Sequence, residues 1–189
     1  MILAVAQDTG GEAAAGKFYD GAKVSFPALI DTQHVVSSLY HMVNVPMGVW
    51  IDEQGRIVRP PEVAYSRKVQ FLTIKVDGDR YAAGLRDWVE KGDKSRYVLQ
   101  PSALKEKLGP RKAAEDLADA NFKLGVYFHQ QGNKELAKKY WQEAQRLNPD
   151  SWNYHRQDWS FTPAEAMTKW MAKFKALGGK EYYPPLEIP

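Results

Sequence analysis

The sequence of 189 residues contains no cysteine. A disulfide, a thiolate metal site, an iron–sulfur cluster and a cysteine nucleophile are therefore excluded for this chain. We expect no cofactor and no metal. This absence restricts the function more strongly than any motif in the sequence.

The sequence also lacks a large charge of one sign and a long hydrophobic run. Its formal net charge is +3, whereas a nucleic-acid-binding domain usually carries a concentrated basic face. No apolar run approaches the roughly 18–20 residues that span a bilayer. The start of the chain, Met1–Asp8, becomes acidic too soon for a signal peptide. We therefore expect no nucleic-acid partner, no membrane partner and a cytoplasmic location.

What the sequence does contain is an ordinary globular composition, 44% hydrophobic and 26% charged. Residues 1–6 form an apolar run that is typical of a strand buried on both faces. An alanine-rich stretch at 12–19 suits a short helix. An extended piece at 26–31 and a helical pattern at 32–42 follow it.

The next segment predicts a β-hairpin. Its two apolar runs, 47–52 and 56–59, are separated by a tight loop in which Gly55 is free to adopt a positive φ. Residues 69–74 could form a further strand before a helix at 79–92. Residues 62–76 have the least informative pattern of the chain.

Three pieces of this region carry a resemblance to a known family. They are Phe26-Pro27-Ala28-Leu29-Ile30-Asp31, Asn44-Val45-Pro46 and the hairpin Val49–Val58. In this order, after the first strand, they resemble the second half of a thioredoxin-like domain of the redoxin (AhpC/TSA-like) type. The resemblance implies a cis peptide bond at Pro46, and a Val45 backbone that contacts an extended substrate. It also implies thiol–disulfide or peroxide chemistry, for which this chain lacks the sulfur.

The family has a further strand and a cysteine-bearing helix before the segment that matches Met1–Asp8. The resemblance implies that residues 1–6 and 47–59 belong to one sheet. The missing strand would lie at its centre, between the strands that match 1–6 and 47–52. Without it, both strands would expose apolar edges, which are templates for pairing. Three outcomes are open: the chain is a fragment, it pairs with a second chain such as a homodimer partner, or its sheet is rearranged. We favour the first.

From residue 111 onward the pattern is helical. Leu124-Gly125, Phe128, Ala137, Trp141, Ala144 and Pro149 have the spacing of one tetratricopeptide repeat, with Asn121 in place of its leading aromatic residue. A single repeat cannot bury its own apolar face. We expect a third helix, which starts at a capping box at 162–165, to cover it.

The sequence therefore predicts a fold with two parts. An α/β thioredoxin-like region with a partial sheet comprises residues 1–92, and its N-terminal part is expected to be incomplete. A connector follows at 93–110. An all-α tetratricopeptide-like module, a helical hairpin with a capping helix, comprises 111–177. An extended tail at 178–189 ends the chain.

The segment 152–161 combines four aromatic residues with polar ones, and it permits two interpretations. It could belong to a surface that binds a peptide or a small ligand. The residues of that surface would be Asn121, Tyr127, Tyr154, Arg156 and Asp158. Alternatively, it is an ordered loop that attaches the helices to the α/β region, with Arg156 and Asp158 satisfying buried polar groups. We favour the second interpretation.

The histidines give no convincing catalytic or metal site. Asp31 and His34 are three residues apart and could share a helix face, but no third ligand follows, so we expect both on a helix surface. Ser37 and His41 are within hydrogen-bond reach on a helix. They lack an orienting acid and an oxyanion site, which a hydrolase requires.

Two function classes follow from these observations. The first is a redoxin-family oxidoreductase whose redox cysteines, if any, lie upstream of Met1, with Val45 and Pro46 shaping the substrate site. The second is a non-catalytic module that uses the α/β region and the helices to hold a protein or peptide partner. As given, the chain should have no disulfide reductase or peroxidase activity.

Overall fold

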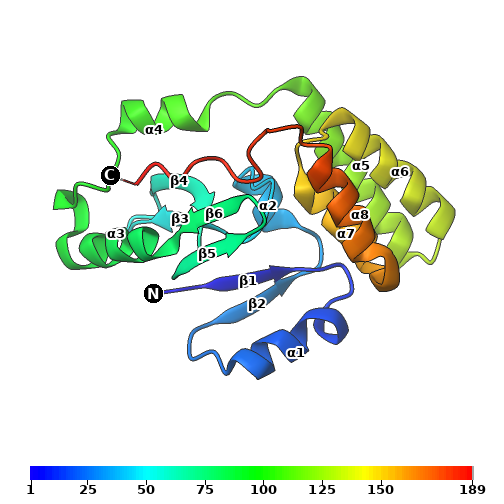
Figure 1. The fold of residues 1–189 in the computed structure, drawn as a ribbon, viewed down its shortest axis with the longest axis horizontal. Helices are drawn as coiled ribbons and strands as arrows, with labels where there is room; N and C mark the ends of the chain where they lie inside the picture. Colours follow the sequence, from blue (N-terminus) through cyan, green and yellow to red (C-terminus); the bar gives the residue numbers. More distant parts are fainter. Residues whose placement is uncertain (189) are drawn as a thin grey trace. The chain divides into compact units, whose positions relative to one another are not determined.

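The computed structural model describes residues 1–188 (Figure 1). Its short strands all lie before residue 78, and the elements that follow are helices. The protein is mixed α/β, with small sheets and many helices. Its contacts form two compact units. Unit 1 comprises Met1–Val43 and Arg111–Lys169, and unit 2 comprises Asn44–Pro110 and the chain from Trp170 onward. The predicted region 1–92 is thus divided between the units. Of the predicted tail 178–189, Pro189 lies outside the described residues.

Unit 1 begins with a parallel β–α–β arrangement. Strand β1 (Ala4–Gln7) pairs with β2 (Ala28–Asp31), and helix α1 (Glu12–Ala22) connects them. The short helix α2 (Val35–Leu39) follows β2. Of the apolar run at 1–6, only residues 4–6 lie in a strand, and they are partly buried. Met1, Ile2 and Leu3 precede the strand and are exposed, so the predicted burial on both faces is wrong.

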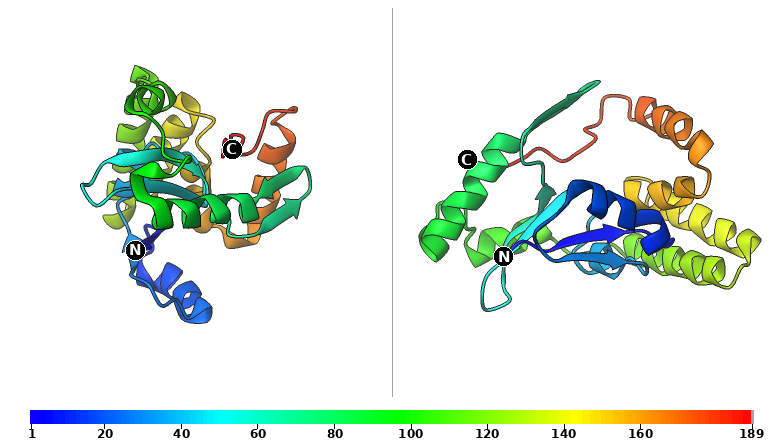
Figure 2. Two further views of the ribbon diagram at one scale, coloured as in Figure 1. Left: turned by 90° about the vertical axis from the view of Figure 1, so that its left-hand side faces the viewer. Right: turned by 90° about the horizontal axis from the view of Figure 1, so that it is seen from below.

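The helices of unit 1 start with a hairpin of α5 (Ala113–Gln130) and α6 (Lys134–Leu147), which lie side by side in Figures 1 and 2. Helix α7 (Trp152–Ser160) follows, and α8 (Pro163–Lys175) continues from unit 1 into unit 2. One hydrophobic cluster fills the hairpin and its junction with α7. Its buried members are Ala118, Phe122, Val126, Ala137, Trp141, Ala144 and Tyr154.

Helix α7 attaches the helical hairpin to the α/β part of unit 1. Three hydrogen bonds do this: Trp152 N to Val43 O at 2.7 Å, Asn153 Nδ2 to Met42 O at 2.7 Å, and Thr9 N to Gln157 Oε1 at 3.0 Å. The favoured interpretation of this segment as an attachment is therefore supported. Its conformation is a helix rather than a loop, and Asn153 and Gln157 make the bonds that we expected from Arg156 and Asp158.

Unit 2 contains two antiparallel hairpins. Strand β3 (Met47–Ile51) pairs with β4 (Ile57–Val63), and β5 (Lys68–Phe71) pairs with β6 (Ile74–Asp77). Strand β4 continues through Pro60 and Pro61, where the prediction ended it. An edge strand tolerates proline because it needs no amide donor on its open side.

Three helices complete unit 2. They are α3 (Gly78–Lys91), the short 3-10 helix η1 (Gly92–Lys94) and α4 (Pro101–Leu108). Trp50, Tyr81, Tyr97 and Ile188 form the buried core. The end of the described chain is thus part of this core. None of the helices in residues 1–188 combines the length and the apolar character that crossing a bilayer requires.

The strands do not form the common sheet that we expected. Within residues 1–188, β1 pairs only with β2, and β3 pairs only with β4, so residues 1–6 and 47–59 lie in separate sheets. The resemblance places a strand between these two pairs, and the sequence does not contain it. The separation of the two pairs counts against the resemblance, which requires residues 1–6 and 47–59 to lie in one sheet.

We predict that Gly125→Ala destabilises the protein, because Gly125 makes room for a neighbouring side chain. A Cβ atom at this position would lie less than 3.0 Å from the indole of Trp141. Overpacking of this kind typically costs about 1–3 kcal/mol, which exceeds the gain of up to about 1 kcal/mol in helix propensity. Urea denaturation of the purified chain measures the difference.

Gly21→Ala is the matched control, since Gly21 also lies in a helix but a Cβ atom added there would meet no atom within 4 Å. This variant should be neutral or slightly more stable, for reasons of helix propensity alone. Equal unfolding midpoints for the two variants would show that the Gly125–Trp141 contact is not tight.

Candidate functional site

The segment Asn44–Pro46 leads into β3, and a buried amide holds it in place. Asn44 is 0% exposed. Its Oδ1 accepts a hydrogen bond from Val45 N at 2.9 Å, and its Nδ2 donates to Tyr182 O at 3.2 Å. The peptide bond between Val45 and Pro46 is cis, as the resemblance implied. The conformation of Val45 is therefore set by a neighbouring side chain and by the C-terminal part of the chain.

The carbonyl of Val45 also has a partner in the C-terminal part. The hydroxyl of Tyr183 donates to Val45 O at 2.7 Å, and the hydroxyl of Tyr65 lies 3.3 Å from that of Tyr183. The rings of Tyr65 and Tyr183 pack edge to face at 6.2 Å. The amide and the carbonyl of Val45 are thus both hydrogen-bonded within the molecule. The resemblance assigns this backbone to contact with an extended substrate.

Aromatic rings surround this segment, and we call them the aromatic cluster. Trp170 Nε1 donates to the hydroxyl of Tyr182 at 3.2 Å, and the Trp170 ring stacks on Phe174 at 4.9 Å. The members of the cluster are Tyr65, Phe71, Trp170, Phe174, Tyr182 and Tyr183. All of them belong to unit 2.

The arrangement is suited to binding a polypeptide. Amide, carbonyl and phenol groups recognise peptide groups by hydrogen bonds, and aromatic faces pack against apolar or proline side chains. A neutral phenol donates and accepts hydrogen bonds but is a weak nucleophile. The named groups can thus form hydrogen bonds and ring contacts, and in this structure they form them within the molecule.

The second predicted site contains a residue that is not accessible. Tyr154 is only 8% exposed, and its ring stacks on Phe122 at 4.6 Å. Burial raises the pKa of the Tyr154 phenol above its ordinary value. Tyr154 therefore belongs to the core of unit 1, because α7 turns this ring toward α5.

The other four residues of that predicted surface have different surroundings. Tyr127 is exposed, whereas Arg156 and Asp158 are half-buried. Asp158 Oδ2 accepts a hydrogen bond from Gln145, and Asn121 Nδ2 donates to a carbonyl one turn earlier in α5. Only Tyr127 thus offers a largely exposed ring to a partner.

His34 is buried rather than on a helix surface. It is 3% exposed, its Nε2 lies 3.1 Å from Thr9 Oγ1, and its ring packs edge-on against Phe122 at 4.9 Å. Asp31 accepts a hydrogen bond from Val36 N at 2.8 Å and so supports the start of α2. Neither residue is arranged as a metal ligand.

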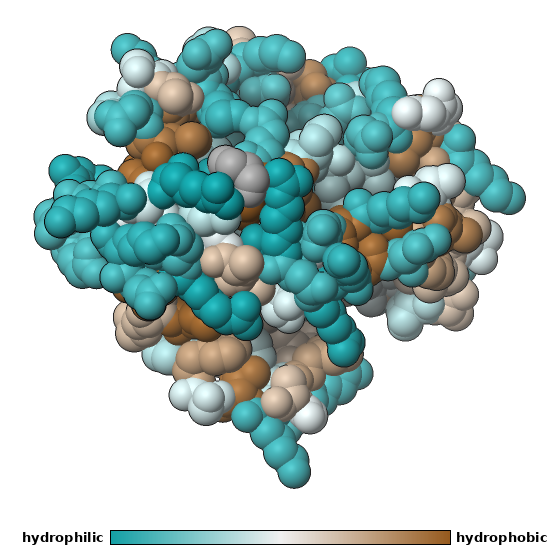
Figure 3. Space-filling view, turned by 60° about the vertical axis from the view of Figure 1, so that its left-hand side comes forward, coloured by the Kyte–Doolittle hydropathy of each residue, from teal (hydrophilic) through white to brown (hydrophobic). Residues whose placement is uncertain are grey.

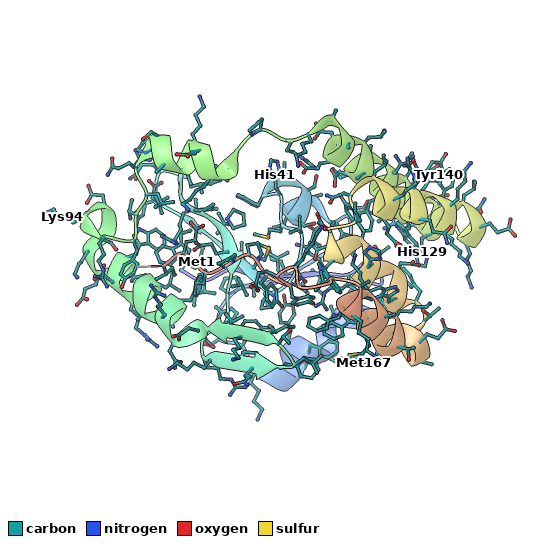
Figure 4. The ribbon with its side chains drawn as sticks, turned by 45° about the horizontal axis from the view of Figure 1, so that its top comes forward. Met1, His41, Lys94, His129, Tyr140 and Met167 are labelled. Carbon is teal, nitrogen blue, oxygen red and sulfur yellow. The ribbon has the colours of Figure 1, made fainter. Side chains whose placement is uncertain are left out.

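The remaining histidines do not form a site either. His41 follows α2 and His129 lies near the end of α5 (Figure 4). The hydroxyl of Ser37 donates to the carbonyl of His34 at 3.2 Å. Among residues 1–188, no group of three or more potential metal-ligating side chains comes together.

Neither a scan against protein-family models nor searches of curated proteins and of solved structures find a match to this chain.

We predict that His34 makes stability depend on pH. Burial lowers the pKa of His34 below its ordinary 6.5, although Asp31 acts in the opposite direction. The unfolded chain then binds more protons than the folded chain just below pH 6.5, so stability falls as the pH falls through this range. His34→Asn should flatten this dependence, measured by urea denaturation at a series of pH values. Asparagine tolerates the left-handed backbone of this position.

His41→Asn is the matched control. His41 also has a left-handed backbone and a lowered pKa, but it is exposed. We expect this variant to change the pH dependence less than His34→Asn does. A wild-type slope that persists in His34→Asn would show that this residue is not the titrating group.

Proposed function

We propose that this chain is part of a thioredoxin-like protein of the redoxin type, and that it holds a polypeptide at Val45 and Pro46. The thiol–disulfide or peroxide chemistry of such a protein requires cysteines that this chain does not contain. One observation carries the proposal: the side chain of Asn44 accepts a hydrogen bond from Val45 N in the segment that leads into the β3–β4 hairpin.

The order of elements around this segment supports the proposal. A parallel β1–α1–β2 unit and the short helix α2 precede it, and the antiparallel hairpin β3–β4 follows it. Up to this hairpin, the order is that of the resembling half-domain. The second hairpin, β5–β6, then lies between β4 and α3 and has no counterpart in the matched pieces. The separate sheets count against the proposal, because the resemblance requires the β1–β2 and β3–β4 pairs to belong to one sheet.

The local chemistry also fits an extended ligand. A strand-like peptide binds through main-chain hydrogen bonds and places alternate side chains in pockets. Val45 is 37% exposed, and its carbonyl already accepts a hydrogen bond from a phenol. The same carbonyl is suited to accept one from a peptide amide.

A second candidate function is that of a non-catalytic interaction module, and α5 provides the observation that favours it. Leu117, Leu124 and Tyr127 lie on one side of α5 and are 53%, 42% and 53% exposed. Exposed apolar patches often mark interaction sites. On the face drawn in Figure 3, apolar side chains surface in patches between polar ones.

We predict that the purified chain shows no dithiol-dependent reduction of insulin and no peroxide reduction, since it cannot form a thiolate. Both rates should equal those of buffer. Thiol-dependent turnover by the purified chain would contradict this expectation.

We further predict that the chain binds an unfolded polypeptide whose cysteines have been blocked, measured by fluorescence polarisation. Val45→Asp should weaken this binding by about tenfold, or ~1.4 kcal/mol, because it places a charge at the contact. Leu117→Asp, on the exposed side of α5, should leave the affinity unchanged. The reverse pattern would favour the interaction module, and no binding at all would overturn the proposed function.

A further inference from the structure

The C-terminal segment Tyr182–Ile188 is anchored at both ends in unit 2. At one end, Tyr182 bonds to Asn44 and Trp170. At the other end, Ile188 is 1% exposed in the core, and Arg59 donates to Glu187 O at 2.9 Å. Between these anchors, the hydroxyl of Tyr183 reaches the carbonyl of Val45.

We infer that Tyr182–Pro185 is an intramolecular ligand of the polypeptide site, and that the site recognises a tyrosine in an extended segment. This inference rests on the proposed function, because it names the class of polypeptide that the same site takes. The contacts of this segment resemble those of a bound peptide. Its main-chain carbonyl at Tyr182 accepts a hydrogen bond from Asn44, and the phenols of Tyr182 and Tyr183 bond to Trp170 and to Val45 O.

Asn44 recognises the main chain of the segment. It is fully buried, and its amide donates to the carbonyl of Tyr182. A buried amide loses its contact with water, so it favours a ligand that supplies a hydrogen-bond partner. Any peptide has such a carbonyl, so this contact favours binding without selecting a sequence.

Tyr183 supplies the selective contact. Its hydroxyl donates to Val45 O at 2.7 Å, and its ring packs against Tyr65. A phenylalanine could make the same ring contact but would leave the carbonyl without this donor. The site therefore distinguishes tyrosine from phenylalanine by the hydroxyl, which bonds to Val45 O and lies 3.3 Å from the Tyr65 hydroxyl. Loss of the bond to Val45 O alone corresponds to about a five- to tenfold change in affinity.

The prolines that follow favour the extended conformation. Pro184 and Pro185 are exposed and have a restricted φ, so the segment loses little conformational freedom when it binds. Because the segment belongs to the same chain, its effective concentration at the site is high, of the order of millimolar for a flexible tether. An external polypeptide must therefore compete with Tyr183.

The experiment compares full-length variants at Tyr183 by fluorescence polarisation. The probe is a labelled peptide with the sequence of residues 180–187, and a second peptide replaces its second tyrosine with phenylalanine. The first peptide should bind Tyr183→Ala about tenfold or more tightly than it binds the wild type. The phenylalanine peptide should bind Tyr183→Ala about five- to tenfold more weakly than the tyrosine peptide.

Tyr183→Phe keeps the ring against Tyr65 and provides a second variant should Tyr183→Ala fold poorly. It should bind the tyrosine peptide more tightly than the wild type does, but the gain in affinity should be smaller than the gain for Tyr183→Ala. Equal affinities of the wild type and of both variants would overturn the inference.

Two other results separate this inference from the proposed function. If Tyr183→Ala binds both peptides equally while Val45→Asp weakens the blocked polypeptide, the tyrosine preference is wrong and the polypeptide site stands. If neither the peptides nor the blocked polypeptide bind to any variant, both proposals are wrong.

Discussion

The arrangement of unit 2 around its candidate site depends on the buried side chain of Asn44. Its amide bonds to the backbone of Val45 on one side and to Tyr182 on the other, and it has no exposed surface. A buried amide without partners typically costs about 1–3 kcal/mol. One side chain thus fixes both the turn before β3 and the position of the C-terminal segment.

The position of the far end of the C-terminal segment, at Glu187, depends on the buried guanidinium group of Arg59. Arg59 is 1% exposed, forms two hydrogen bonds with Glu62 and donates to the carbonyls of Tyr97 and Glu187. A guanidinium group that is removed from water needs such partners, because the desolvation of an unpaired charge costs several kcal/mol. Arg59 and Asn44 therefore hold the two ends, and the tyrosine between them is positioned by both.

Local patterns predicted much of the secondary structure, and long-range contacts explain what they missed. The apolar run at 1–6, the hairpin around Gly55 and the spacing in α5 and α6 each carry a local signal. The bond between Val45 and Tyr183 joins residues 138 positions apart, so no local pattern contains it. His34 is buried by Thr9 and Phe122, which come from other segments.

The absence of sulfur and the occupied Val45 carbonyl together constrain how a redoxin-type protein would use this chain. Under the proposed function, a polypeptide that takes the hydrogen bond of the Val45 carbonyl must first take the place of the Tyr183 hydroxyl. Binding would therefore depend on this exchange of hydrogen bonds. The exchange must also release the Tyr182 carbonyl from Asn44, whereas the bond from Arg59 to Glu187 and the core around Ile188 can stay in place.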